Sequence, residues 1–171
     1  MDSFGKIVAL LISIVLLFIT PLIYTAEKQD IITQNYIAFE TTKFVDSIKN
    51  TGYLSDDMYF SFIKNLDATN LLYDIEIVHS HKVVEPIYDE TTNTFLNDYN
   101  TYTYNTYQDE IIESLDTIGS YYFTKEDYIS VQLINKSKTF ATKLKELLYS
   151  IDMIEEQIFV SYGGMIRDEA Y

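Results

Sequence analysis

The sequence predicts an α+β fold in which one long N-terminal helix is followed by a small domain with about three strands and three helices. The first reason is an uncharged, apolar run over residues 7–26. The second is that helical periodicity continues beyond this run, and residues 26–50 contain neither Gly nor Pro. The third is an alternation of helical and strand patterns over residues 53–171, which we interpret as a single extracytoplasmic domain.

The apolar run predicts a transmembrane helix over residues 7–26, preceded by a short tail over residues 1–6. Lys6 precedes the run and Glu27 follows it. Twenty helical residues span roughly 30 Å, which matches the hydrocarbon core of a bilayer. A cleaved signal peptide and a buried core helix are the alternatives. Signal peptides have a shorter apolar stretch and a small-residue cleavage site, whereas Tyr24 stands where a small residue is needed. We therefore favour an uncleaved anchor.

The charges that flank the run indicate its orientation. Lysine and arginine are enriched on the cytoplasmic side of membrane spans. Lys6 and the amino terminus lie before the run, and Lys28 lies after it. This difference favours a single-pass protein of a bacterial cell membrane with a cytoplasmic N-terminus and an extracellular C-terminal domain.

Residues 27–52 are predicted to continue the same helix as a stalk. One face of this helix is marked by four residues at helical spacing: Ile37, Thr41, Phe44 and Ile48. Gly52 is the predicted stop, and Pro21 is expected to kink the helix near the outer interface. The stripe must be covered by the domain itself or by neighbouring copies. Ile37, Phe44 and Ile48 are therefore candidate interaction residues, and a homo-oligomer is possible.

The domain is predicted from caps and periodicities. Ser55 is a good N-cap for a helix that ends near Leu66. The other expected elements are a strand over residues 73–84, a helix over 108–118, a strand over 128–134, a helix over 138–151 with an apolar face that includes Phe140, Leu147 and Ile151, and a strand over 157–161 that Gly163 and Gly164 break or bulge.

Residues 88–107 are rich in Tyr, Thr and Asn, and we expect them to form a flexible surface loop. A hairpin or edge strand is the alternative, because Thr and Tyr favour pleated surfaces. Tyrosine offers a large contact area at low entropy cost. Four tyrosines are therefore candidate recognition residues, although their rings could instead pack back on the domain: Tyr99, Tyr102, Tyr104 and Tyr107.

Composition excludes several classes of function. The formal net charge of the 171-residue chain is −14, which repels phosphate backbones and argues against a nucleic-acid partner. The chain has no cysteine, so it has no disulfide, no thiolate metal site and no cysteine nucleophile. We assign no catalytic residue and no cofactor, because phosphate-loop, serine-hydrolase and metalloprotease motifs are absent from the sequence.

His79 and His81 are the only weak candidates for a metal site. They lie two residues apart on a predicted strand, so both side chains point to one face. Such a pair can hold zinc or copper when a third ligand is supplied from elsewhere. The sequence indicates no carboxylate near them, and we therefore predict no metal site.

Four segments resemble a known family: YTAEKQDII at 24–32, FVDSIKNTGYLSDDMYFSF at 44–62, YDIEIVH at 73–79 and YGGMIRDE at 162–169. With the plan of a membrane helix, a stalk and a small α+β head, they resemble type IV pilins and pseudopilins. More narrowly, the chain is similar to TadE/TadF-like membrane-anchored proteins of tight-adherence (Tad) pilus clusters. The resemblance implies a pilin-like fold and contacts with other pilus or assembly subunits through the N-terminal helix.

One position departs from the pilin pattern. Pilin precursors are cut after a glycine, and the mature chain usually has Glu at its fifth position. Cleavage after Gly5 would place Leu10 there.

We expect a non-catalytic structural or assembly component of a bacterial surface pilus or secretion apparatus, anchored in the lipid bilayer. An anchored extracytoplasmic binding or sensory module is the alternative, and a hydrolase or metalloprotein that uses His79 and His81 is a third hypothesis.

Overall fold

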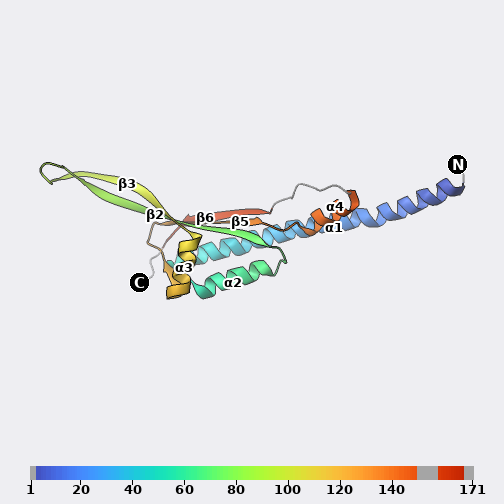
Figure 1. Ribbon diagram of the computed structural model, residues 1–171, viewed down its shortest axis with the longest axis horizontal. Helices are drawn as coiled ribbons and strands as arrows, with labels where there is room; N and C mark the ends of the chain where they lie inside the picture. The colour runs from blue at the N-terminus through green and yellow to red at the C-terminus, as the bar shows by residue number, and fades with distance from the viewer. Residues whose placement is uncertain (1–2, 150–157, 168–171) are drawn as a thin grey trace.

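The computed structural model describes residues 3–149 and 158–167. It confirms the α+β class: a long N-terminal helix is followed by a small domain with three further helices and several strands. The molecule is elongated (Figure 1), with the N-terminus at one end and a β-hairpin at the other.

Helix α1 (Ser3–Thr51) is 49 residues long and continues through Pro21. Pro21 has no N–H to donate, but its carbonyl accepts a hydrogen bond from the Thr25 hydroxyl at 2.8 Å. The helix ends at Gly52, as predicted, where φ is +73° and the backbone N–H donates to the Ile48 carbonyl at 2.8 Å. Glycine adopts this left-handed conformation without a steric cost.

A four-stranded antiparallel sheet forms the main body of the domain. Its strands lie in the order β3 (Phe95–Tyr107), β2 (Tyr73–Tyr88), β5 (Tyr128–Asn135) and β6 (Phe159–Met165). Two short strands, β1 (Tyr53–Ser55) and β4 (Ser120–Tyr122), form a second, two-stranded sheet. The described residues therefore contain more strands than the three that the sequence predicted.

The second half of α1 lies between the sheet and helix α2 (Asp56–Asp67), as Figure 1 shows. Ser55 caps α2 as predicted, because its hydroxyl accepts a hydrogen bond from the Met58 N–H at 3.3 Å. The Phe44 and Phe62 rings stack with their centroids 4.2 Å apart. Burial of such apolar surface is the main source of stability.

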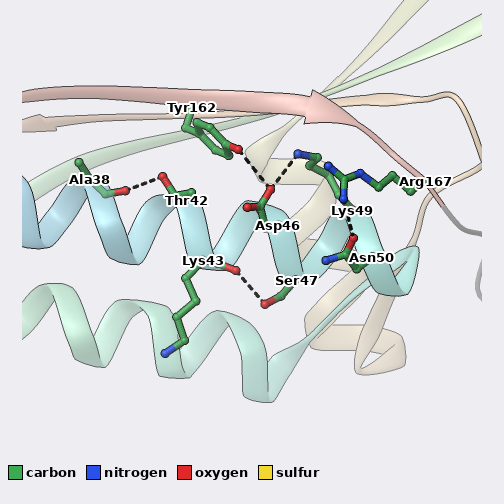
Figure 2. A network of polar contacts seen from close by, with 9 residues as sticks. All are labelled: Ala38, Thr42, Lys43, Asp46, Ser47, Lys49, Asn50, Tyr162 and Arg167. Atoms are coloured by element: carbon green, nitrogen blue, oxygen red, sulfur yellow. Dashed lines mark hydrogen bonds and ion pairs between the residues drawn. The ribbon is translucent and has the colours of Figure 1, made fainter.

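Polar contacts fix the end of α1 to β6 (Figure 2). The Asp46 carboxylate accepts hydrogen bonds from the Lys49 ammonium at 2.8 Å and from the Tyr162 hydroxyl at 3.2 Å. The Arg167 N–H donates to the Lys49 carbonyl at 2.9 Å. A Cβ at Gly163 would lie 2.7 Å from the carbonyl oxygen of Ile129, so this strand position has no room for a side chain.

Helices α3 (Gln108–Ile118) and α4 (Phe140–Tyr149) complete the domain. Helix α3 ends at Gly119, as predicted, with a φ of +78°. Helix α4 packs beside α1, and its Lys145 ammonium lies 2.9 Å from the Glu27 carboxylate. The predicted apolar face of α4 is covered in part: Leu144 and Leu148 are half-buried, whereas Phe140 and Leu147 are exposed. Ile151 lies outside the described residues.

The clearest departure from the sequence prediction lies in residues 88–107. We expected a flexible loop, but residues 95–107 form β3 and pair with β2 in a hairpin, which was the alternative. Almost all side chains of β3 are exposed, so the strand lacks the alternation of apolar and polar residues that marks a half-buried strand. Gly163 and Gly164 also lie within β6 and do not end it. The predicted start of that strand, at residue 157, lies outside the described residues.

Candidate functional sites

The first half of α1 is apolar and uncovered. Among the described residues, one helix is long and apolar enough to span a membrane, and none of its most apolar 18-residue stretch is buried within the protein. Leu17, for example, is 70% exposed. Exposed apolar surface of this extent is costly in water and is typical of a membrane-contacting segment.

The second half of α1 has the opposite environment. Ile37 and Ile48 are 0% exposed, and Phe44 is buried in the same core as residues of α2 and the sheet. The protein's own domain therefore covers these three residues, which was one of the two alternatives for the stripe.

His79 and His81 converge on a carboxylate that the sequence analysis did not identify. The Nε2 atom of His79 lies 2.8 Å from Asp127 Oδ2, and the Nδ1 atom of His81 lies 2.6 Å from Asp127 Oδ1. One donor atom from each of the three side chains falls within 4.8 Å of the other two. Asp127 is 46 and 48 residues away from the two histidines along the chain, so no local spacing pattern predicts this cluster.

Three backbone contacts hold Asp127 in place at the start of β5. Its Oδ2 atom accepts a hydrogen bond from the Thr124 N–H at 2.8 Å, and its own N–H donates to the Thr124 carbonyl at 3.1 Å. Its carbonyl accepts from the Ile166 N–H at 2.7 Å. Asp127 is only 2% exposed, so its carboxylate lies inside the protein in a fixed orientation.

His79 is enclosed by aromatic rings. Phe123 lies edge-on at 4.7 Å between centroids, and the Tyr121 hydroxyl lies 2.7 Å from His79 Nδ1. Burial lowers the pKa of His79 from its usual value, although the hydrogen bond with Asp127 opposes this shift. A neutral ring with a proton on Nε2 can donate to Asp127, which leaves Nδ1 to accept from Tyr121. Burial also raises the pKa of Tyr121, which keeps its hydroxyl protonated.

The cluster lies where β2 leaves the sheet. The last pair between β2 and β5 is Ser80 with Tyr128, whereas β2 pairs with β3 from Val78 to Tyr88. His79 and His81 therefore lie on either side of the point where the hairpin begins to project beyond β5. His79 is buried, while the side chain of His81 is 38% exposed, so the cluster is reached from solvent on the His81 side.

The four candidate tyrosines all lie on β3 and are all exposed. They do not form one surface. Side chains alternate between the two faces of a strand, so Tyr99 and Tyr107 lie on one face of the hairpin and Tyr102 and Tyr104 on the other. Tyr104 pairs across the strands with His81, and the Tyr102 hydroxyl donates to the Glu85 carboxylate at 2.8 Å.

The chain matches no protein-family model, no curated protein and no solved structure.

Proposed function

We propose that the chain is a non-catalytic, membrane-anchored structural or assembly component of a bacterial surface pilus or secretion apparatus, similar to pseudopilins. The observation that carries the proposal is the division of α1 into an uncovered apolar half and a half buried in the domain. One continuous helix therefore supplies both a membrane-contacting segment and the central element of the fold. The sequence segments that resemble TadE/TadF-like proteins support the narrower assignment to a Tad pilus.

The contact surface expected of such a component is the apolar half of α1. Helices in lipid associate through close packing, and small residues favour it. Gly5, Ala9 and Ser13 recur at every fourth position. A Cβ added at Gly5 would have no neighbouring atom within 4 Å, so this face of the helix is open to a neighbouring helix.

Cysteine cross-linking in the native membrane tests the proposal directly. Because the chain has no cysteine, each single-cysteine variant carries one reactive thiol. With an added oxidant, we expect Ala9→Cys to form disulfide-linked dimers, or products with subunits that carry a cysteine of their own, while Leu72→Cys, on the exposed surface of the domain, does not. Cross-linking that is equally weak at both positions would contradict lateral association through α1.

The N-terminal sequence of the protein recovered from that membrane refines the role. A chain that begins at Lys6 indicates pilin-type processing and a filament subunit, despite Leu10. A chain that retains the residues before Lys6 indicates a permanent anchor and an assembly role. A chain that begins near Glu27 indicates a secreted protein, which would overturn the proposal.

The second candidate function is an anchored binding module, and the exposed hairpin favours it. β3 is an edge strand with aromatic side chains on both faces. Edge strands accept partner strands through their free backbone groups. A Tyr99→Ser, Tyr104→Ser variant that stays folded but no longer co-purifies with its native partner would support this function. A variant that loses cross-linking only at α1 positions would favour the structural role.

A further inference from the structure

We propose that His79, His81 and Asp127 form a zinc site that fixes the β2–β3 hairpin to the domain. Two imidazole nitrogens and one carboxylate oxygen converge within 4.8 Å, from two different segments of the chain. This inference does not depend on the proposed pilus role.

The donor set fits zinc. Zinc is bound by His nitrogen at about 2.0–2.1 Å and by Asp oxygen at about 2.0–2.2 Å, in tetrahedral geometry. Three protein ligands leave a fourth position for water, and the exposed edge of His81 faces solvent. The two nitrogen–oxygen contacts, at 2.8 and 2.6 Å, are shorter than tetrahedral ligand separations. The His79 contact is to Oδ2 and the His81 contact is to Oδ1, so the ion would replace both hydrogen bonds and the rings would move away from the carboxylate to admit it.

Charge also favours a cation here. Asp127 carries its carboxylate at a position that is 2% exposed, and a buried carboxylate is costly unless it is neutralised. The rings of His79 and His81 are the side chains that contact its two oxygens. A divalent ion held by the same three side chains would offset the carboxylate charge, and the net charge of −14 raises the local concentration of cations.

The protons can rearrange without net loss. To bind zinc through Nε2, His79 must carry its proton on Nδ1, where it then donates to the Tyr121 oxygen 2.7 Å away. The Tyr121 hydroxyl, freed from His79, has a second partner in Thr106. His81 would bind the ion through Nδ1, with its proton on Nε2. A metal-bound histidine that donates its other N–H to a fixed acceptor is the usual arrangement in zinc sites.

The position of the cluster explains what the ion would do. Beyond Ser80, strand β2 has lost its β5 partner and pairs with β3 alone. Three backbone contacts hold Asp127 beside β5 and β6. A zinc ion that joins His81 to Asp127 would therefore fix the base of the hairpin at this point. The hairpin would then keep one direction relative to the sheet.

Zinc titration of the full chain tests the proposal. The protein is purified in detergent without a polyhistidine tag, stripped with a chelator and titrated against a chromophoric zinc competitor. We expect one ion per chain and a higher Tm on adding zinc, but not magnesium. His81→Ala should reduce affinity by more than the roughly tenfold to 100-fold that is typical of losing an outer partner, and Tyr121→Phe should reduce it about tenfold.

Glu85→Gln is the matched control, because it removes an exposed carboxylate from the same hairpin. It should leave zinc affinity unchanged. Equal binding by wild type, His81→Ala and Glu85→Gln would mean that zinc binds only to the acidic surface, and would overturn the proposal. No binding at all would also overturn it and would leave the cluster as a hydrogen-bonded brace.

Imidazole NMR gives a second readout that needs no variant. His79 and His81 are the only two histidines, so each ring gives its own signals. We expect zinc to shift both rings and to move the proton of His79 from Nε2 to Nδ1. Rings whose tautomers do not change at saturating zinc would contradict the assignment, even if a His81 variant failed to fold.

Discussion

The two halves of α1 have the same secondary structure and opposite surroundings. Leu17 in the first half is 70% exposed, whereas Ile48 in the second half is 0% exposed. Both are large aliphatic residues in one uninterrupted helix. The local sequence therefore determines that both halves are helical. Which apolar residues are buried depends on where the rest of the domain packs against the helix. Equal substitutions in the two halves should have different consequences.

The largest difference is expected from a buried charge. Ile48→Asp places a carboxylate in the core and should destabilise the domain by more than about 4 kcal/mol, a large share of the stability of a small domain. Leu17→Asp should leave the domain folded. Near-ultraviolet circular dichroism and limited proteolysis in detergent measure this contrast. A folded, monomeric Ile48→Asp protein would show that the second half covers a neighbouring copy.

A charge in the first half should affect membrane insertion instead. Leu16→Arg lies at the centre of the apolar run and should weaken insertion by about 2.5–3.5 kcal/mol. Phe39→Arg is the control, because Phe39 is exposed in the second half. Carbonate extraction of membranes should release the first variant and retain the second. Release of both would place the membrane boundary beyond residue 39.

Substitutions at two glycines should differ less in their effect on stability. Gly163→Ala would bring a Cβ to 2.7 Å from the Ile129 carbonyl oxygen, whereas Gly5→Ala meets no atom within 4 Å. Overpacking of this kind typically costs about 1–3 kcal/mol. We expect a lower Tm for Gly163→Ala and an unchanged Tm for Gly5→Ala. An unchanged Tm for both would mean that β6 moves away from β5 without cost.

The smallest effect concerns the polar contacts at the end of the second half (Figure 2). The hydrogen bond from Lys49 is the main reason why the pKa of Asp46 lies below its usual 3.8. A lowered pKa stabilises the folded state above the usual value, and this stabilisation is lost as the pH falls through the folded-state value. Asp46→Asn should therefore cost less than about 1 kcal/mol at pH 7, because the carboxylate is partly exposed.

Denaturant titrations at several pH values measure the Asp46 effect. The difference in unfolding free energy between wild type and Asp46→Asn should shrink towards zero in acid. A difference that stays constant down to the acid limit would show that the substitution is destabilising for steric reasons and not through lost charge.

Local signals predicted the local structure. Ser55 and Gly119 marked the start of one helix and the end of another, and the structure has both boundaries at these residues. The spacing of Ile37, Phe44 and Ile48 identified the buried face of α1. The partner of that face was not predictable, because a stripe of apolar residues has the same pattern whether it packs within one chain or between two.

Long-range pairings were missed for a related reason. β3 has no buried face to give it an apolar alternation, and its pairing with β2 supplies the hydrogen bonds that stabilise it as a strand. Asp127 meets His79 only because β5 pairs with β2, so that residues 48 positions apart become neighbours. A carboxylate just before a predicted strand was the only available signal, and many acids in this chain share that description.

The ion pair between Lys145 and Glu27 determines how far the domain lies from the membrane surface. Glu27 directly follows the apolar run, so with that run in a bilayer α4 lies at the level of the lipid headgroups, and the domain has almost no clearance above the membrane. The hairpin lies at the opposite end of the molecule (Figure 1) and becomes its most distant part. No flexible joint separates the two ends along α1. A tilt of the membrane helix by about 20° would therefore displace the end of α1, about 38 Å beyond Ala26, sideways by roughly 13 Å.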